Sequence, residues 1–137
     1  MIVQKNGIPL ARAVIAKHKD GSLTFAGNLH KGDIVKLGFG NVELIMNNPL
    51  KSLFHKYNIE DTETFFIYTC MARRRYMPDL IDIEIKPFSK IAPTAGFFTY
   101  GEFYHHNGKN ELLNQTLTIL ALSEKDDVNY EATSIIH

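Results

Sequence analysis

The sequence predicts a single α+β domain in which helices pack on a mixed β-sheet. A chain of 137 residues falls in the size range of one domain. Residues 64–70 are apolar on both faces, which is typical of a central strand. After Pro78, apolar residues recur near helical spacing, at Leu80, Ile83, Phe88 and Ile91. Strand-like and helix-like segments therefore alternate in the second half of the chain.

The first part of the chain is predicted to form a β-meander. Residues 10–17 and 22–26 have strand character, and Asp20-Gly21 between them is a hairpin signal. A turn-rich connection at 27–33 leads to a third predicted strand at 34–37. Consecutive antiparallel strands joined by such turns form a meander.

A helix and a polar linker are predicted before the central strand. Asn41 is a suitable N-cap, and residues 41–57 follow helical spacing imperfectly. The Asn-Asn-Pro sequence at 47–49 is expected to break or kink this helix, because proline lacks the backbone donor and clashes with the preceding turn. We interpret residues 59–63 as a linker.

The second half is predicted to contain a βαβ unit. Three arginines lie within residues 71–76, after the central strand, and Pro78 can occupy the first turn of the next helix. Pro87 should stop or kink that helix. Residues 81–86 also alternate between apolar and polar, so a strand is the alternative there. The unit spanning 64–100 would be a right-handed crossover if its two strands are parallel.

Residues 97–100 and 116–122 are interpreted as a long-looped antiparallel hairpin at the centre of the sheet. The first segment is rich in aromatic and β-branched residues, and the second is a continuous apolar run. Asn107-Gly108 between them is a strong turn signal. The residues that follow lose the apolar pattern, so we expect a domain over 1–124 and a linker or tail over 125–137.

Composition narrows the classes of function. The 15 basic residues balance 15 acidic ones, unlike the charge of a nucleic-acid-binding domain. A single cysteine excludes an internal disulfide and a thiolate zinc cluster. No apolar run approaches the roughly 20 residues that cross a bilayer, and the first residues lack the apolar segment of a signal peptide. We expect a cytoplasmic protein without nucleic-acid binding or a membrane span.

Three groups of polar residues are candidates for a binding site. Arginines 73–75 follow the central strand, where ligands bind in crossover units, and a guanidinium could hold a carboxylate bidentately. Tyr100, Gly101 and Glu102 could line a pocket, with Gly101 allowing close backbone approach. Glu102 could accept hydrogen bonds from an ammonium group, so an arginine and Glu102 would match a zwitterion. The third group offers amide and hydroxyl donors and acceptors: Asn114, Gln115 and Thr116.

Each group has a structural alternative. The arginines could form a solvated basic patch with partners such as Asp79 and Glu84. Gly101 could mark a bulge, and Glu102 could pair with an arginine, because a buried carboxylate needs such a partner. Residues 114–116 could satisfy the loop backbone before the strand.

Other reactive side chains are given structural interpretations. Cys70 is expected to be a small buried hydrophobe rather than a reactive thiol. Adjacent His105 and His106 would point to opposite faces of a strand, so we interpret them as part of a mobile loop and not as metal ligands. The sequence has no Ser-His-Asp order, phosphate loop or HExxH motif. We therefore expect no metal and no cofactor.

Three segments together resemble the C-terminal half of the FIST domain family, whose name stands for F-box and intracellular signal transduction. They are Cys70 with the arginines after it, residues 96–102, and residues 113–118. The aromatic segment ending in Gly-Glu, followed by Asn-Gln-Thr, is the specific part, and the likeness extends to Glu124. The resemblance implies a bacterial cytosolic sensory domain that binds small molecules such as amino acids. It also implies an attached output module, such as a diguanylate cyclase of the GGDEF type, a two-component histidine kinase or a chemotaxis receptor.

The resemblance has further implications for the site and for signalling. It selects Arg73, because the family motif places an arginine shortly after the cysteine. It implies a FIST N-terminal half outside this chain, so that a site between the halves would be only partly present here. Ligand binding would change the orientation of the halves, or of the subunits of a homodimer, and the tail would pass this change on.

Two other functions are compatible with the same residues. One is an enzyme acting on small carboxylates, with Glu102 as acid or base and Arg73 as anchor. The other is a dimerisation or interaction module whose aromatic strand faces a partner.

Overall fold

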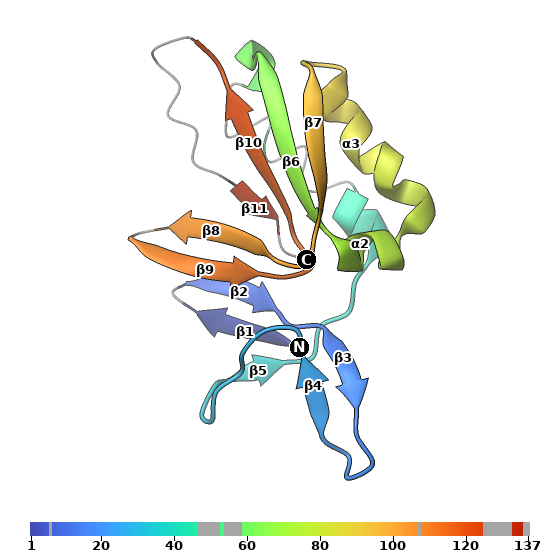
Figure 1. Cartoon of the computed structure of the whole chain (residues 1–137), viewed down its shortest axis with the longest axis vertical. Coiled ribbons are helices and arrows are strands. Elements are labelled where there is room, and N and C mark those ends of the chain that lie inside the picture. The colour runs from blue at the N-terminus through green and yellow to red at the C-terminus, as the bar shows by residue number, and fades with distance from the viewer. Residues whose placement is uncertain (6, 47–52, 54–58, 107, 125–132, 136–137) are drawn as a thin grey trace.

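The computed structural model describes residues 1–5, 7–46, 53, 59–106, 108–124 and 133–135 (Figure 1). Strands and helices are combined in a single α+β domain, as the sequence predicts. Residues 42–46 are helical. The other elements are β1 (Ile2–Lys5), β2 (Ile8–Ala11), β3 (Val14–Lys17), β4 (Leu23–Phe25), β5 (Val35–Lys36), the 3-10 helix η1 (Ile59–Asp61), β6 (Thr64–Cys70), α2 (Met71–Tyr76), the 3-10 helix η2 (Pro78–Leu80), α3 (Ile81–Ser89), β7 (Thr94–Thr99), β8 (Glu102–His106), β9 (Lys109–Leu113), β10 (Leu117–Leu122) and β11 (Thr133–Ile135).

A mixed sheet with the strand order β11-β10-β6-β7 forms one end of the molecule (Figure 1). β6 is a central strand, parallel to β7 and antiparallel to β10. Because α2, η2 and α3 connect β6 to the parallel β7, the predicted βαβ unit is confirmed. Residues 81–86 are helical rather than extended, and Pro87 lies inside α3, two residues before the helix ends.

α3 packs on one face of this sheet. The rings of Phe65 in β6 and Phe88 in α3 meet edge to face, with centroids 5.4 Å apart. The alternate β6 residues Phe66 and Tyr68 are only half-buried, so the sheet has one covered face and one more open face. The described residues of the main apolar cluster are Leu53, Ile59, Phe65, Ile67, Phe88, Ala92, Leu117 and Ile119.

The predicted meander is wrong. β3 and β4 do form an antiparallel hairpin around the predicted Asp20-Gly21 turn. However, β5 pairs with β1, a strand that the sequence reasoning missed, and β1 also pairs with β2. The predicted strand at 10–17 is interrupted at Arg12-Ala13, because residues 8–11 pair with β1 and residues 14–17 with β4. A second apolar cluster, Val3, Leu10 and Leu113, holds this small sheet against β9.

The predicted hairpin of residues 97–100 with 116–122 is also wrong. β7 and β10 do not pair with each other; they flank β6 on opposite sides. A central strand has backbone donors and acceptors along both of its edges, and each edge needs a neighbouring strand. β7, which follows the crossover, pairs with one edge of β6, and β10 pairs with the other. The segment interpreted as a mobile loop is instead the antiparallel hairpin β8–β9, whose turn contains Gly108 at φ +72°.

Four smaller predictions have different outcomes. Asn41 is an N-cap, since its Oδ1 accepts the backbone N–H of Leu44 at 3.1 Å. The predicted break at 47–49 lies outside the described residues. The predicted linker at 59–63 is partly a 3-10 helix whose Ile59 is buried in the main core. In the predicted tail, the backbone of Thr133–Ile135 pairs with β10 as β11, while the division into 1–124 and 125–137 stays a prediction.

None of the helices in the described part of the chain has the length and apolar character needed to span a membrane.

Substituting Gly96 tests the β6–β7 pairing. A Cβ at this position would overlap the carbonyl oxygen of Ile67 and lie 2.8 Å from its carbonyl carbon. Backbone cannot move aside without disturbing the parallel ladder, so Gly96→Ala should lower the free energy of unfolding by about 1–3 kcal/mol, measured by urea denaturation. Ala95→Ser, on the exposed neighbour, is the matched control and should change it by less than about 0.5 kcal/mol. An unchanged Gly96→Ala protein would contradict this account.

Candidate functional site

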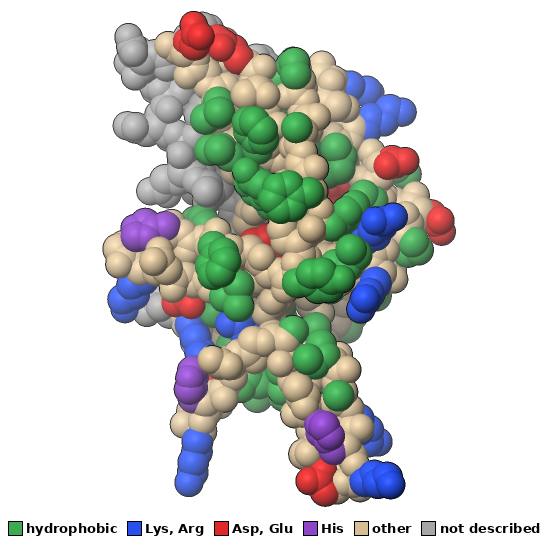
Figure 2. Space-filling view, in the orientation of Figure 1, with side chains coloured by type: hydrophobic (Ala, Val, Ile, Leu, Met, Phe, Trp, Pro, Cys, Tyr) green, Lys and Arg blue, Asp and Glu red, His purple; other side chains and the backbone are tan. Residues whose placement is uncertain are grey.

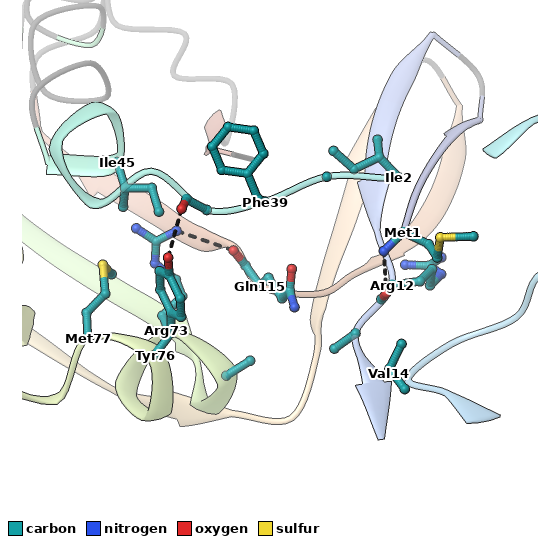
Figure 3. Close-up of a pocket in the computed structure, with 14 residues that line it drawn as sticks. Met1, Ile2, Arg12, Val14, Phe39, Ile45, Arg73, Tyr76, Met77 and Gln115 are labelled. Carbon is teal, nitrogen blue, oxygen red and sulfur yellow. Dashed lines mark hydrogen bonds between the residues drawn. The ribbon is translucent and has the colours of Figure 1, made fainter. Parts of the chain in front are cut away.

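A cavity of about 200 Å³ opens between the N-terminal strands and α2. Four parts of the chain that are distant in sequence line it (Figure 3). They are the N-terminal segments 1–2 and 12–14, the Gly-Phe-Gly segment 38–40 with Ile45, the inner side of α2 with Met77, and Gln115 before β10. The cavity therefore exists only in the folded protein.

Arg73 is the buried cation of this cavity. Its side chain comes from α2, directly after the central strand, and the residue is only 4% exposed. Nη2 donates to the carboxylate of Glu84 on α3. Nη1 donates to the backbone oxygen of Gln115 at 3.3 Å, as Figure 3 shows. The alternative in which the arginines form a solvated basic patch correctly named Glu84 as a partner. The Arg73–Glu84 pair is buried, however, so a solvated patch is wrong for Arg73. Arg74 and Arg75 are exposed.

The α2 wall of the cavity is attached to the Gly-Phe-Gly segment. Tyr76 Oη donates to the backbone oxygen of Gly40 at 2.7 Å (Figure 3). A Cβ on Gly40 would lie 2.9 Å from the Tyr76 ring, so glycine allows this close approach. The bond fixes the distance between two of the four segments.

Gln115 has an unusual backbone. Its φ of +60° lies in the left-handed region, and it is the only non-glycine residue with positive φ among the described residues. Such a conformation is uncommon for a glutamine and costs energy that the surroundings must supply. It directs the backbone oxygen to Arg73 while the residue lines the cavity.

Arg12 is a cavity residue that the sequence reasoning missed. It is 4% exposed, and its Nη1 donates to Asn114 Oδ1 at 3.0 Å and to the backbone oxygens of Ala11 and Leu112. Burial lowers the pKa of Arg12, and the charge of Glu111 partly opposes that shift. A cation inside the apolar run of residues 10–16 is the sequence signal that could have identified it. The predicted Asn114 therefore acts here as the partner of Arg12.

Glu102 belongs to a separate polar cluster. It is 3% exposed and accepts hydrogen bonds from the hydroxyls of Thr99 and Thr116. Burial raises the pKa of Glu102, and these hydroxyl donors partly offset the rise. The alternative in which Glu102 pairs with an arginine is wrong, because its described partners are the hydroxyls of Thr99 and Thr116 and the thiol of Cys70. Glu102 is also absent from the described cavity lining, so it does not face Arg73 across the cavity.

The remaining predicted residues lie away from the cavity. Tyr100 is 80% exposed. Gly101 packs closely against the hairpin, since a Cβ there would lie 2.9 Å from Leu112 and 3.3 Å from the Asn114 amide nitrogen. Thr116 is fully buried beside Glu102. Of the seven predicted residues, the structure thus brings Arg73 and Gln115 to the cavity, and the role of all seven in ligand binding stays a prediction.

Cys70 is buried, as the sequence predicts, whereas His105 and His106 lie in a strand and not in a loop. Cys70 is buried, and burial raises the pKa of its thiol, which disfavours the reactive thiolate. His105 is in a strand and its Nδ1 contacts Asn110 Oδ1 at 2.7 Å across the hairpin. Within the described ranges, no group of three or more histidine, cysteine, aspartate or glutamate side chains could hold a metal ion.

The described lining of the cavity combines hydrogen-bonding side chains with apolar surface. Its described polar groups are guanidinium, amide and phenol, and its described lining contains no carboxylate, thiol or imidazole. Such a set can bind and orient a ligand.

The buried ion pair gives a prediction about stability. Arg73→Leu leaves the Glu84 carboxylate buried without its partner, so we expect a loss of roughly 3–5 kcal/mol in the free energy of unfolding, measured by urea denaturation. Arg73→Leu/Glu84→Leu should recover most of this loss, because no charge then remains buried. Arg75→Leu, in the same helix but exposed, is the control and should change little. A double variant as unstable as the sum of the single variants would contradict the interpretation.

The raised pKa of Glu102 predicts a pH dependence. The folded protein holds the Glu102 proton more tightly than the unfolded chain, so this group's contribution to the free energy of unfolding falls as pH rises from the ordinary carboxyl pKa through the raised one. Glu102→Gln removes this titration. The stability difference, variant minus wild type, should therefore rise with pH across that window and then become constant in urea titrations. Glu43→Gln, at an exposed position, is the control, and a difference that falls with pH would contradict the assignment.

Comparison with known families agrees with the resemblance found in the sequence. The family model described as FIST C domain matches residues 1–105. The match includes the cavity segments up to α2 and the 96–102 segment, and residues 114–116 lie beyond it. No curated protein and no solved structure matches the chain. Because the family model covers more than half of the sequence, the chain belongs to the FIST C domain family, a family of signalling-associated domains.

Proposed function

We propose that this chain is the small-molecule-sensing part of a bacterial cytoplasmic signal-transduction protein and has no catalytic activity of its own. The observation that carries the proposal is the cavity of about 200 Å³ with the buried Arg73 in its wall. Membership of a signalling-associated family supports the regulatory role. The guanidinium of Arg73 can bind a ligand, because the described hydrogen bonds use only two of its five N–H donors.

The size of the cavity limits the ligand. Sites for drug-sized molecules have volumes of roughly 300–1,000 Å³, and an engineered apolar cavity of about 150 Å³ can hold benzene. A volume of about 200 Å³ therefore matches a small metabolite, of the size of an amino acid or a short carboxylic acid.

The position of the cavity supports a route for the signal. A ligand would contact the N-terminal strands and α2 at once, so it would stabilise one relative arrangement of these elements. Gln115 lines the cavity two residues before β10, and β10 pairs with β11 near the end of the chain. A change at Gln115 would thus be passed along the sheet to an output module, such as a diguanylate cyclase, histidine kinase or chemotaxis receptor, working with the FIST N-terminal half.

Exposed aromatic side chains favour a second candidate, an interaction module. Hydrophobic side chains gather over the face of β10, β6 and β7 that is visible in Figure 2. Phe97 is 64% exposed, and Phe103 on the neighbouring hairpin is 87% exposed. Side chains of this kind are common in surfaces that contact a partner.

Filling the cavity separates the two functions. Ala72 on α2 lines the cavity, and Ala72→Leu should abolish the rise in melting temperature caused by a ligand that stabilises the wild type. A ligand at 100 times its dissociation constant should stabilise the wild type by about 2.7 kcal/mol, so the loss is measurable in a thermal-shift screen of amino acids, carboxylic acids, sugars and nucleosides.

Ala16→Leu, exposed on β3, is the matched control and should keep the full shift. In the intact receptor, output should lose its ligand response with Ala72→Leu. The interaction module would be supported instead if no compound shifts the melting temperature and if Phe97→Ser or Phe103→Ser changes the output of the receptor.

A further inference from the structure

We infer that the ligand of this cavity is a small carboxylic acid with an apolar body and no ammonium group. The inference rests on the proposed function and names the chemical class of its ligand. Two arginines, Arg12 and Arg73, are among the described lining residues, and these residues include no aspartate or glutamate. The charged side chains that the described wall presents are therefore guanidiniums, while Glu84, the carboxylate partner of Arg73, lies outside the described lining; this arrangement favours an anion in the cavity.

Arg73 provides the directional contact for a carboxylate. Of its five N–H donors, the described hydrogen bonds use one on Nη2, to Glu84, and one on Nη1, to Gln115. The second N–H of Nη1 and that of Nη2 are used by no described hydrogen bond, whereas Nε, which also has no described partner, is buried. A planar guanidinium with unused donors at a cavity wall is suited to hold both oxygens of a carboxylate.

Arg12 contributes charge rather than a direct contact. Its Nη1 makes three hydrogen bonds, to Asn114 Oδ1 and to two backbone oxygens, and these acceptors are neutral. Its Nε is buried and has no partner among the described residues, and it lies close to Gly27, because a Cβ added to Gly27 would be 2.8 Å from it. Arg12 is thus fixed in place, and its positive charge remains available to an anion in the cavity, on the other side of Gln115 from Arg73 in Figure 3.

An ammonium group on the ligand would lack a partner. Glu84 binds Arg73 through Oε1 and Glu102 accepts from two threonine hydroxyls, and neither carboxylate is among the described lining residues. A cation placed in this cavity would lose its hydration beside two guanidiniums, one of them already paired with Glu84, with no carboxylate in the described lining. The zwitterion predicted from the sequence therefore does not match the arrangement of charges.

The apolar part of the cavity wall determines which hydrocarbon group of a ligand can fit. Ile2, Phe39, Ile45 and Met77 line the cavity and offer apolar surface. Together with the volume of about 200 Å³, this surface suits a short aliphatic chain or a single phenyl ring attached to the carboxylate.

Two matched series of compounds test the inference by isothermal titration calorimetry on the full chain. The first is hexanoate, its α-amino derivative norleucine and hexanamide; the second is 3-phenylpropionate, phenylalanine and 3-phenylpropanamide. Within a series, the compounds share a carbon skeleton and differ in charge. We expect at least one acid to bind tenfold or more tightly than both its amino-acid and its amide counterparts.

Variants assign the binding to the cavity. Arg73→Gln/Glu84→Gln removes both buried charges and should weaken acid binding at least tenfold, while Arg75→Gln should leave it unchanged. If circular dichroism shows that the double variant is unfolded, Arg73→Lys keeps the charge beside Glu84 and should still weaken binding, because it loses the fork geometry. Acid binding that survives in every folded Arg73 variant would overturn the inference.

The compounds also distinguish this inference from the proposed function. Phenylalanine or norleucine binding as tightly as the matching acid would overturn the carboxylic acid class and leave the sensing function standing. An amide binding as tightly as the acid would do the same, as would a failure of all six compounds when the only compounds of the wider screen that bind are not carboxylic acids. If no compound of the wider screen raises the melting temperature, both the carboxylic acid class and the proposed sensing function would be contradicted.

Discussion

The buried ion pair between Arg73 and Glu84 is the interaction on which the candidate site depends. Removing two charges from water is expensive, and mutual attraction compensates only when geometry and further hydrogen bonds are good. Here Arg73 gains the backbone oxygen of Gln115, while Arg73 Nε and Glu84 Oε2 have no partner among the described residues. We therefore interpret the pair as an interaction that positions the Arg73 side chain rather than one that stabilises the fold. It fixes α2 against α3 and places a guanidinium in the cavity wall.

Polar contacts, rather than a shared apolar core, connect the two ends of the molecule. The described apolar residues form two clusters, one between α3 and the mixed sheet and one around Val3, Leu10 and Leu113. Arg12 bonds to the segment before β10, and Glu102 joins the hairpin to Thr116 of the same segment. Hydrogen bonds depend on distance and angle, so such a junction favours particular relative arrangements of the two ends. This gives the proposed sensing function a physical basis.

Several elements could be predicted because their signals are local. The apolar run of β6, the Asp20-Gly21 hairpin and the Asn41 cap depend on adjacent residues, and all three are present. Pairing between distant strands was not predictable in the same way. Residues 97–100 and 116–122 both have strand character, but nothing in their sequence shows that each would pair with β6 instead of with the other. β1 was missed because four residues at the start of the chain carry little periodicity.

The sequence by itself determined the α+β class, the βαβ unit, the family, and the placement of an arginine after the central strand, since these follow from local pattern and motif. Only the tertiary structure decided which partner each charged group has. Arg73 meets Glu84 because α3 folds back on the sheet, and Glu102 meets two threonines because three strand ends converge. Spacing along the chain does not specify such contacts, because the packing of whole elements sets the distances between side chains. The cavity follows from the same packing, with four distant segments in its wall.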